Sequence, residues 1–291
     1  MKKECLFIDV FTDIPYTGNQ LAVFPDVVQL TQDNMQALAN EINYSETTFI
    51  VESQDPSYDF QVRIFNPKNE MPFAGHPILG TAFAIIHILK RWDSTRGLLR
   101  LKTQVGVIPI EIVDGVLWMQ QNQPEFYGDH TDKEKPANFI GLSPDDLMDE
   151  LPVEEVSTGN RMMIIPVKTL DAVRRAEGNV LHLKQFFGER NAGPYLFTFE
   201  TTRPEAKVHT RFFAPHLGII EDAATGSAAG PLTAYLLKHS VFGERFEIIN
   251  EQGVEMNRPS QIHMKGEKHD DQYVVKIGGR CVFVGTGEFT V

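Results

Sequence analysis

The feature that most constrains the fold of this chain is an internal repeat. Residues 63–67 read Arg-Ile-Phe-Asn-Pro, and residues 211–215 read Arg-Phe-Phe-Ala-Pro. A short loop follows each proline and ends in a glycine with a polar neighbour, Gly75-His76 in the first copy and Gly226-Ser227 in the second. Each pair opens an apolar segment that begins with small residues. Repetition of this kind predicts two related structural units, each with a strand, a loop and a helix.

Both apolar segments are predicted to be central helices. Residues 77–86 and 228–237 are apolar on nearly every side, which is typical of a helix surrounded by strands. Their Gly-polar starts leave backbone N–H groups of the first turn open to a ligand. Two such helix starts facing each other would favour a carboxylate or an enolate-like intermediate. The alternative is that both are simply buried helices with good caps.

The pattern of apolar residues around the repeats predicts a mixed α/β chain. An amphipathic helix is expected from the N-cap Thr31 to about Asn43, and the pair Asp114-Gly115 predicts a hairpin. We interpret the polar residues 120–135 as the boundary between the units, and Gly278-Gly279 as a turn. Strands are expected at residues 5–11, 21–24, 47–51, 59–65, 107–113, 116–119, 162–167, 195–199, 207–213, 246–249, 261–264, 273–277 and 281–284, and further helices near residues 143–144 and 180–187.

Composition argues against several classes of partner and site. Asp and Glu number 39 and Lys and Arg 27, a net charge of −12, so without a basic patch we expect no nucleic-acid partner. We find neither a signal peptide nor an apolar run long enough to span a membrane, and we expect a cytoplasmic protein without membrane contact. The only cysteines, Cys5 and Cys281, support neither a disulfide framework nor a cysteine zinc site.

Several segments between residues 7 and 260 together resemble one known family. The chain is similar to the PhzF-like isomerases of phenazine biosynthesis, which share their fold with diaminopimelate epimerase. Any one of the segments alone would be weak, but their combination and order are specific. The segments are Phe7–Thr12, Gly18–Val23, Asn43–Phe49, Phe65–Pro77, Glu221–Ala228 and, more weakly, Gln252–Ser260.

The resemblance implies a fold of the α/β (α+β) class with two pseudo-symmetric lobes. Each lobe would be a central helix wrapped by a curved mixed β-sheet, with the substrate cleft between the lobes, no cofactor and a homodimer as the assembly. We assign residues 1–122 to the N-terminal lobe, completed by a C-terminal strand at about 280–291. Residues 123–279 form the C-terminal lobe.

The resemblance also implies roles for particular side chains. Glu46 corresponds to the glutamate that shuttles the proton, and His76, Asp222 and Ser227 correspond to residues that line the site. The related epimerases place one cysteine at each helix start. Here His76 and Ser227 stand at those positions, so epimerisation by two cysteines is excluded. Asn257 stands where the family has a glycine, and we expect the turn to survive because Asn tolerates a left-handed backbone.

Considered residue by residue, these candidates have both structural and functional interpretations. Glu46 is a solvated acid or, in a partly apolar cleft, a base with a raised pKa. His76 is a capping residue or a neutral imidazole that polarises a carbonyl, and Asp222 is a loop residue or a group that holds substrate or orients His76. No other ligand lies at metal-binding spacing near His76, so no metal is expected. The predicted substrate-binding residues are Asn19, Ser45, Gly75, Ser157, Gly226 and Ser227.

The sequence therefore predicts an isomerase that uses no cofactor. It would move a proton between carbons of a small carboxylated substrate, with Glu46 as general acid and base. One alternative is an epimerase or racemase of an amino or hydroxy acid, with Glu46 and Asp222 as two bases. Another is a non-catalytic protein that binds small molecules on the same scaffold.

Overall fold

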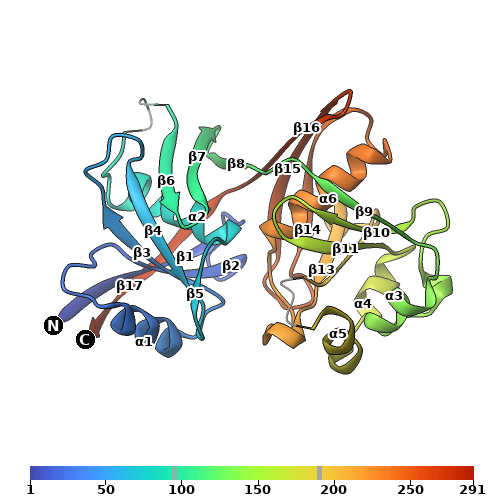
Figure 1. Cartoon of the computed structure of the whole chain (residues 1–291), viewed down its shortest axis with the longest axis horizontal. Helices are drawn as coiled ribbons and strands as arrows, with labels where there is room; N and C mark the ends of the chain where they lie inside the picture. Colours follow the sequence, from blue (N-terminus) through green and yellow to red (C-terminus); the bar gives the residue numbers. More distant parts are fainter. Residues whose placement is uncertain (94, 96, 189–191) are drawn as a thin grey trace. The chain divides into compact units, whose positions relative to one another are not determined.

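The computed structural model describes residues 1–93, 95, 97–188 and 192–291 (Figure 1). The chain divides into two compact units. Unit 1 contains Met1–Met119 and Gly278–Val291, and unit 2 contains Gln120–Ile277. The C-terminal segment thus returns to unit 1. Strands and helices occur in both units, which confirms the predicted α/β class.

Unit 1 is built on a mixed β-sheet. Strand β1 (Lys2–Val10) pairs antiparallel with both β2 (Asn19–Phe24) and β17 (Cys281–Thr290), and β2 pairs in parallel with β3 (Thr47–Glu52). β4 pairs antiparallel with β3 and β5 and in parallel with β6, and β6, β7 and β8 form antiparallel pairs. Their bounds are β4 (Phe60–Phe65), β5 (Glu70–Met71), β6 (Leu99–Thr103), β7 (Gly106–Val113) and β8 (Val116–Gln120).

Helix α2 (Gly75–Phe83) lies at the centre of unit 1. It contacts β1, β2, β3, β4, β6 and β17, and its residues from Gly75 to Ala82 are all buried. A Cβ at Gly80 would lie 2.4 Å from Leu21 Cδ2, so this close packing requires a glycine. The helix continues as a π-helical turn at Ala84–Ile88. The first predicted central helix is confirmed.

Helix α1 (Gln32–Ile42) forms as predicted. The hydroxyl of its N-cap Thr31 accepts a hydrogen bond from the backbone N–H of Asn34 at 3.2 Å, and the Asn34 side chain accepts from the Thr31 N–H at 3.0 Å. These two bonds pair orphan N–H groups of the first turn. Asn43 ends the helix in the left-handed conformation, with φ 55°. The chain therefore turns sharply just before Ser45 and Glu46.

Unit 2 repeats this construction. Its sheet runs in the order β9 to β15, in which the β11–β12 and β13–β14 pairs are parallel and the other pairs are antiparallel. Helix α6 (Gly226–Lys238) is largely buried and contacts β10, β11 and β15, as predicted for the second central helix. The strands are β9 (Glu125–His130), β10 (Val153–Ser157), β11 (Arg161–Pro166), β12 (Pro194–Thr198), β13 (Ala206–Phe212), β14 (Arg245–Gln252), β15 (Ser260–His269) and β16 (Gln272–Gly279).

Short helices of unit 2 pack against its strands in an apolar cluster. The cluster includes Val173, Leu183 and Phe187 among other buried residues. The helices are α3 (Glu134–Phe139), α4 (Leu170–Arg175) and α5 (Val180–Phe187), with 3₁₀ turns at Pro144–Asp146 and Pro215–Leu217. In the part of the chain that the structure describes, no helix is both long and apolar enough to cross a membrane.

One strand lies where none was expected and one predicted turn was wrong, and each has a physical reason. The polar residues 120–135 contain strand β9, whose side chains are mostly exposed; its backbone pairing with β10 holds it in place. Gly278 and Gly279 belong to β16 and form no turn. A Cβ would lie 2.7 Å from the Trp118 ring at Gly278 and 2.4 Å from the Phe11 ring at Gly279, so the glycines make room for aromatic rings.

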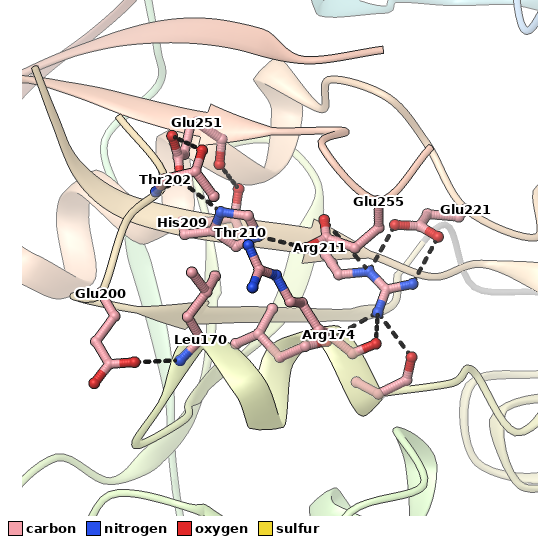
Figure 2. A network of polar contacts seen from close by, with 12 residues as sticks. Leu170, Arg174, Glu200, Thr202, His209, Thr210, Arg211, Glu221, Glu251 and Glu255 are labelled. Atoms are coloured by element: carbon pink, nitrogen blue, oxygen red, sulfur yellow. Dashed lines mark hydrogen bonds and ion pairs between the residues drawn. The ribbon is translucent and has the colours of Figure 1, made fainter. Parts of the chain in front are cut away.

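The repeat includes a matched ion pair that the sequence pattern did not reveal. Arg63 donates from Nε and Nη2 to both carboxylate oxygens of Glu70, at 2.8 and 2.7 Å. Arg211 makes the same paired contact with Glu221, at 2.8 Å for both bonds (Figure 2). Each arginine lies on the strand of the R-[IF]-F-x-P motif, and each acid precedes the central helix. The pair therefore ties the loop before that helix to the sheet.

Replacing these arginines should destabilise the protein to different degrees. Arg211→Met should lower the free energy of unfolding by about 3–5 kcal/mol, because Glu221 would keep a buried charge without its partner. Arg63→Met should lower it less, because the Arg63 side chain is 22% exposed and that of Arg211 only 9%. Urea denaturation of both variants measures the difference. Arg175→Met, at a 53% exposed side chain, is the control; equal losses in all variants would contradict the prediction.

Candidate active site

Unit 1 places Glu46 where its carboxyl group is largely removed from water. The residue lies between α1 and β3, immediately before the strand begins. Its side chain is only 13% exposed. Burial raises the pKa of Glu46 from 4.5 to about 7, and a hydrogen bond from the Ser45 side chain partly opposes this rise. At neutral pH such a carboxyl group can both accept and donate a proton.

The imidazole of His76 lies beside this carboxyl group. His76 is the second residue of α2, and its Nε2 is 3.5 Å from Glu46 Oε2. Its Nδ1 is 3.4 Å from Asn19 Nδ2. An amide nitrogen only donates, so Nδ1 of a neutral imidazole accepts and the ring proton lies on Nε2. The N–H group of the His76 ring therefore lies on the side of the Glu46 carboxyl group.

The Asn19 side chain contacts both Ser45 and His76. Its Oδ1 accepts a hydrogen bond from Ser45 Oγ at 3.5 Å, while its amide nitrogen faces His76. Asn19 opens β2 opposite Val10, so this strand begins two residues before the predicted start at residue 21. Gly18 before it has φ 71°, and a Cβ there would lie 2.4 Å from the Val10 carbonyl oxygen. The glycine allows the tight turn after which strand pairing fixes Asn19.

The start of α2 adds backbone donors to this group. Its N-cap residue Ala74 makes no side-chain capping bond, and Gly75 is the first helical residue. The N-terminus of a helix carries a partial positive charge. Asn19, Ser45, Glu46, Gly75 and His76, all predicted from the sequence, thus belong to one local arrangement in unit 1.

Unit 2 gathers a second set of predicted residues at the start of α6. Asp222 lies in the loop between β13 and α6, and its Oδ2 accepts a hydrogen bond from Thr225 Oγ1 at 2.7 Å. Thr225 is the N-cap but makes no side-chain capping bond. Gly226 and Ser227 are the first two helical residues, and Ser227 is half-buried. Asp222 is thus bonded to the N-cap of the helix whose first turn carries Ser227.

Ser157 ends β10, a strand that packs against α6. Its Oγ accepts a hydrogen bond from the Gly159 N–H at 3.1 Å. The next residue, Thr158, lies close to the helix, because a Cβ at Gly230 would lie 2.5 Å from Thr158 Oγ1. The structure therefore places Ser157 near the same helix as Ser227, with its hydroxyl bonded to the following turn.

One residue that the sequence analysis did not single out, Gln252, holds the loop before α6. Gln252, the last residue of β14, bonds to both Asp222 and Thr225. The sequence did contain a clue to Gln252, because this residue begins the segment Gln252–Ser260 that resembles the family more weakly. Asn257 in that segment has φ 55°, the left-handed conformation expected for it. Within the described residues, no group of three or more His, Cys, Asp or Glu side chains could hold a metal ion.

Comparison with known proteins identifies the family. The sequence model of the family described as phenazine biosynthesis-like protein (PhzC-PhzF) matches residues 8–287. The chain belongs to the PhzF family. This confirms the resemblance found in the sequence motifs.

Relatives with known names place this PhzF-family chain among isomerases. It is 35% identical to the trans-2,3-dihydro-3-hydroxyanthranilate isomerase of Pseudomonas fluorescens over 97% of each chain. The crystal structure of a PhzF-family phenazine biosynthesis protein of Bacillus anthracis is similar to this chain, with 29% sequence identity. The structural match covers 100% of each chain, with a TM-score of 0.89. A hydroxyproline epimerase of Agrobacterium vitis shares the fold alone, with a TM-score of 0.64, 10% identity and coverage of 99% and 92%. The protein is a PhzF-family isomerase.

The raised pKa of Glu46 should be visible in the pH dependence of stability. Between about pH 4.5 and 7 the folded protein retains this proton and the unfolded chain releases it. The stability that the protonated carboxyl group contributes is therefore fully present below the unfolded pKa and is lost as pH rises through the folded pKa. Glu46→Gln removes this titration. The unfolding free energy of Glu46→Gln minus that of wild type should therefore increase by up to about 3 kcal/mol as the pH rises from about 4.5 to 7.

Urea denaturation at a series of pH values tests this prediction. Glu52→Gln is the matched control, because Glu52 ends the strand that follows Glu46 and its side chain is 69% exposed. Glu52→Gln also replaces one glutamate by glutamine, so its pH series gives the background for Glu46→Gln. A difference for Glu46→Gln that follows the same course as this control would show that Glu46 titrates as an ordinary solvated acid.

Proposed function

We propose that this isomerase moves a proton between two carbons of a small carboxylated substrate, with Glu46 as general acid and base. The observation that carries the proposal is the buried carboxyl group of Glu46, with a pKa raised to about 7, beside the imidazole of His76. A proton carrier must release and recover the proton with similar ease, and a pKa near the working pH provides this. A solvated glutamate would be a much weaker base.

In this proposal His76 stabilises the charge that develops on the substrate. When Glu46 removes a proton from carbon, negative charge spreads toward the substrate's conjugated group. The N–H of His76 and the start of α2 provide hydrogen-bond donors for that charge. Asn19 holds the imidazole in the tautomer that carries its proton on Nε2.

We propose that Asp222 and Ser227 take part in the same reaction. The Ser227 hydroxyl and the first N–H groups of α6 would donate hydrogen bonds to the substrate carboxylate. Asp222 would hold a polar group of the substrate or exchange a proton with it. Support comes from Ser227 in the first turn of a largely buried helix without a side-chain cap, and from the bond of Asp222 to the N-cap Thr225 of that helix.

The name of the Pseudomonas fluorescens relative suggests the first substrate class to test. That relative is an isomerase of trans-2,3-dihydro-3-hydroxyanthranilate, a cyclic diene carboxylate. On a diene of this class, a proton would leave one ring carbon, the double bonds would shift, and the proton would return to another carbon. Nothing else is added or lost, so the acid–base groups of the chain suffice for the proposed step.

Solvent deuterium tests the proposal. The protein in D₂O is incubated with trans-2,3-dihydro-3-hydroxyanthranilate and with a panel of other carboxylated carbon acids, including proline and 4-hydroxyproline. Mass spectrometry detects deuterium bound to carbon, and NMR identifies the position. We expect deuterium in an isomerised cyclic diene. Glu46→Gln should reduce the rate by about 100-fold or more, the usual contribution of a general base.

The exposed acid Glu52 supplies the control for charge and folding. Glu52→Gln should exchange deuterium at the wild-type rate. Exchange by Glu46→Gln at the wild-type rate would contradict the assignment of Glu46. Deuterium at the α-carbon of proline or 4-hydroxyproline, with inversion and without a double-bond shift, would instead identify an epimerase.

A further inference from the structure

A buried amide side chain makes several of the bonds that hold the loop carrying Asp222. Gln252 ends β14 and is fully buried. It lies opposite Thr210 on the neighbouring β13 and opposite Ser260 on β15. Pairing on both sides fixes the backbone of Gln252, so its side chain is presented to the loop from a rigid part of the sheet.

Both ends of the Gln252 amide are fully used. Nε2 donates to the backbone oxygen of Asp222 at 2.8 Å and to Thr225 Oγ1 at 2.9 Å. Oε1 accepts from the Thr225 N–H at 3.1 Å and from the Tyr195 hydroxyl at 2.9 Å. Two donated and two accepted bonds exhaust the capacity of a glutamine side chain.

The backbone partners fix the direction of these bonds. A carbonyl oxygen can only accept and a backbone N–H can only donate, so the amide cannot be turned around without losing both contacts. Because Thr225 Oγ1 accepts from Gln252, its own proton is free to go to Asp222 Oδ2, 2.7 Å away. Gln252 thus holds Asp222 twice, directly at the backbone and through Thr225 at the carboxylate.

From this geometry we propose that Gln252 is a positioning residue that sets the orientation of the Asp222 carboxylate for the reaction. The catalytic part of this inference rests on the proposed function of Asp222. The hydroxyl of Tyr195 supports Gln252 from the other side and itself accepts a bond from Asn250 Nδ2 at 2.9 Å. All members of this chain of bonds except Asp222 are uncharged at neutral pH, so the chain acts on the carboxylate through hydrogen bonds.

The residue next to Gln252 supplies a matched control. Side chains alternate along a strand, so Glu251 points to the other face of β14. There its carboxylate binds Thr202 and, at 2.7 Å, His209 Nδ1 (Figure 2). Glu251→Gln therefore disturbs a buried polar network on the same strand without touching the Gln252 amide.

Steady-state kinetics on the substrate identified by deuterium exchange tests the proposal. Gln252→Leu should lower kcat by about 100-fold, the size of effect expected when a reacting group is misplaced by about 1 Å. KM should change by less than about 3-fold, because Asp222 itself remains. Glu251→Gln should keep the wild-type kcat even if its melting temperature falls.

A second pair of variants tests the link through Thr225 and does not depend on the folding of Gln252→Leu. Thr225→Val removes the hydroxyl and should lower kcat, whereas Thr225→Ser keeps the hydroxyl and should restore most of it. Folded Gln252→Leu and Thr225→Val proteins with wild-type kcat would overturn the proposal. So would an equal fall in kcat for Glu251→Gln, because the effect would then be general destabilisation.

Amide hydrogen exchange separates this proposal from the proposed function. If the wild-type protein acts on none of the compounds, the proposed function fails, but the Thr225 N–H still reports on Gln252. Its exchange should be faster in Gln252→Leu and unchanged in Glu251→Gln. Unchanged exchange in Gln252→Leu would overturn the positioning role whether or not the protein is active.

Discussion

The burial of the Glu46 carboxyl group is the constraint on which the chemistry proposed for unit 1 depends. Desolvation disfavours the charged form of a carboxyl group, and here it raises the pKa to about 7. The surrounding structure maintains this burial: Asn43 ends α1 sharply, β3 begins at Thr47, and α2 brings His76 to 3.5 Å. Each of these elements is fixed by backbone pairing or packing and not by the carboxyl group itself. The scaffold can therefore hold the Glu46 carboxyl group in an environment that disfavours its ionised form.

The internal repeat explains how one scaffold presents two different sets of polar groups. In each unit a largely buried helix begins with a glycine and a polar residue, and a paired Arg–Glu contact ties the preceding loop to the sheet. The residues at the helix starts differ, with His76 in one unit and Ser227 in the other. The shared parts are structural, and the parts that differ are the polar side chains at the helix starts.

The sequence predicted those parts of the fold that depend on local patterns. The N-cap Thr31 and the left-handed Asn43 bound α1, and the positive φ angles of Asp114 and Gly115 form the hairpin turn. Strand β9 was not predicted, because an exposed strand carries no apolar pattern in its sequence and needs only a backbone partner. Gly278 and Gly279 were misread because the same residue type serves a turn and a strand that packs against aromatic rings. Only the tertiary contacts distinguish the two.

The candidate site shows the same limit. Motifs identified Glu46, His76 and Asp222, but not the contacts that give them their properties. Asn19 reaches His76 across 57 positions of sequence, and Gln252 reaches Thr225 across 27. Such contacts depend on strand register, which a single sequence does not reveal.

The titration of the Glu46 carboxyl group is the most direct test of this arrangement. Carboxyl-carbon NMR of the ¹³C-labelled protein follows each glutamate with pH, and the signal missing in Glu46→Gln identifies Glu46. We predict an inflection near pH 7, where burial places the pKa of Glu46. An inflection near 4.5, the value of a solvated glutamate, would contradict the central claim that the fold prepares this group to carry a proton at neutral pH.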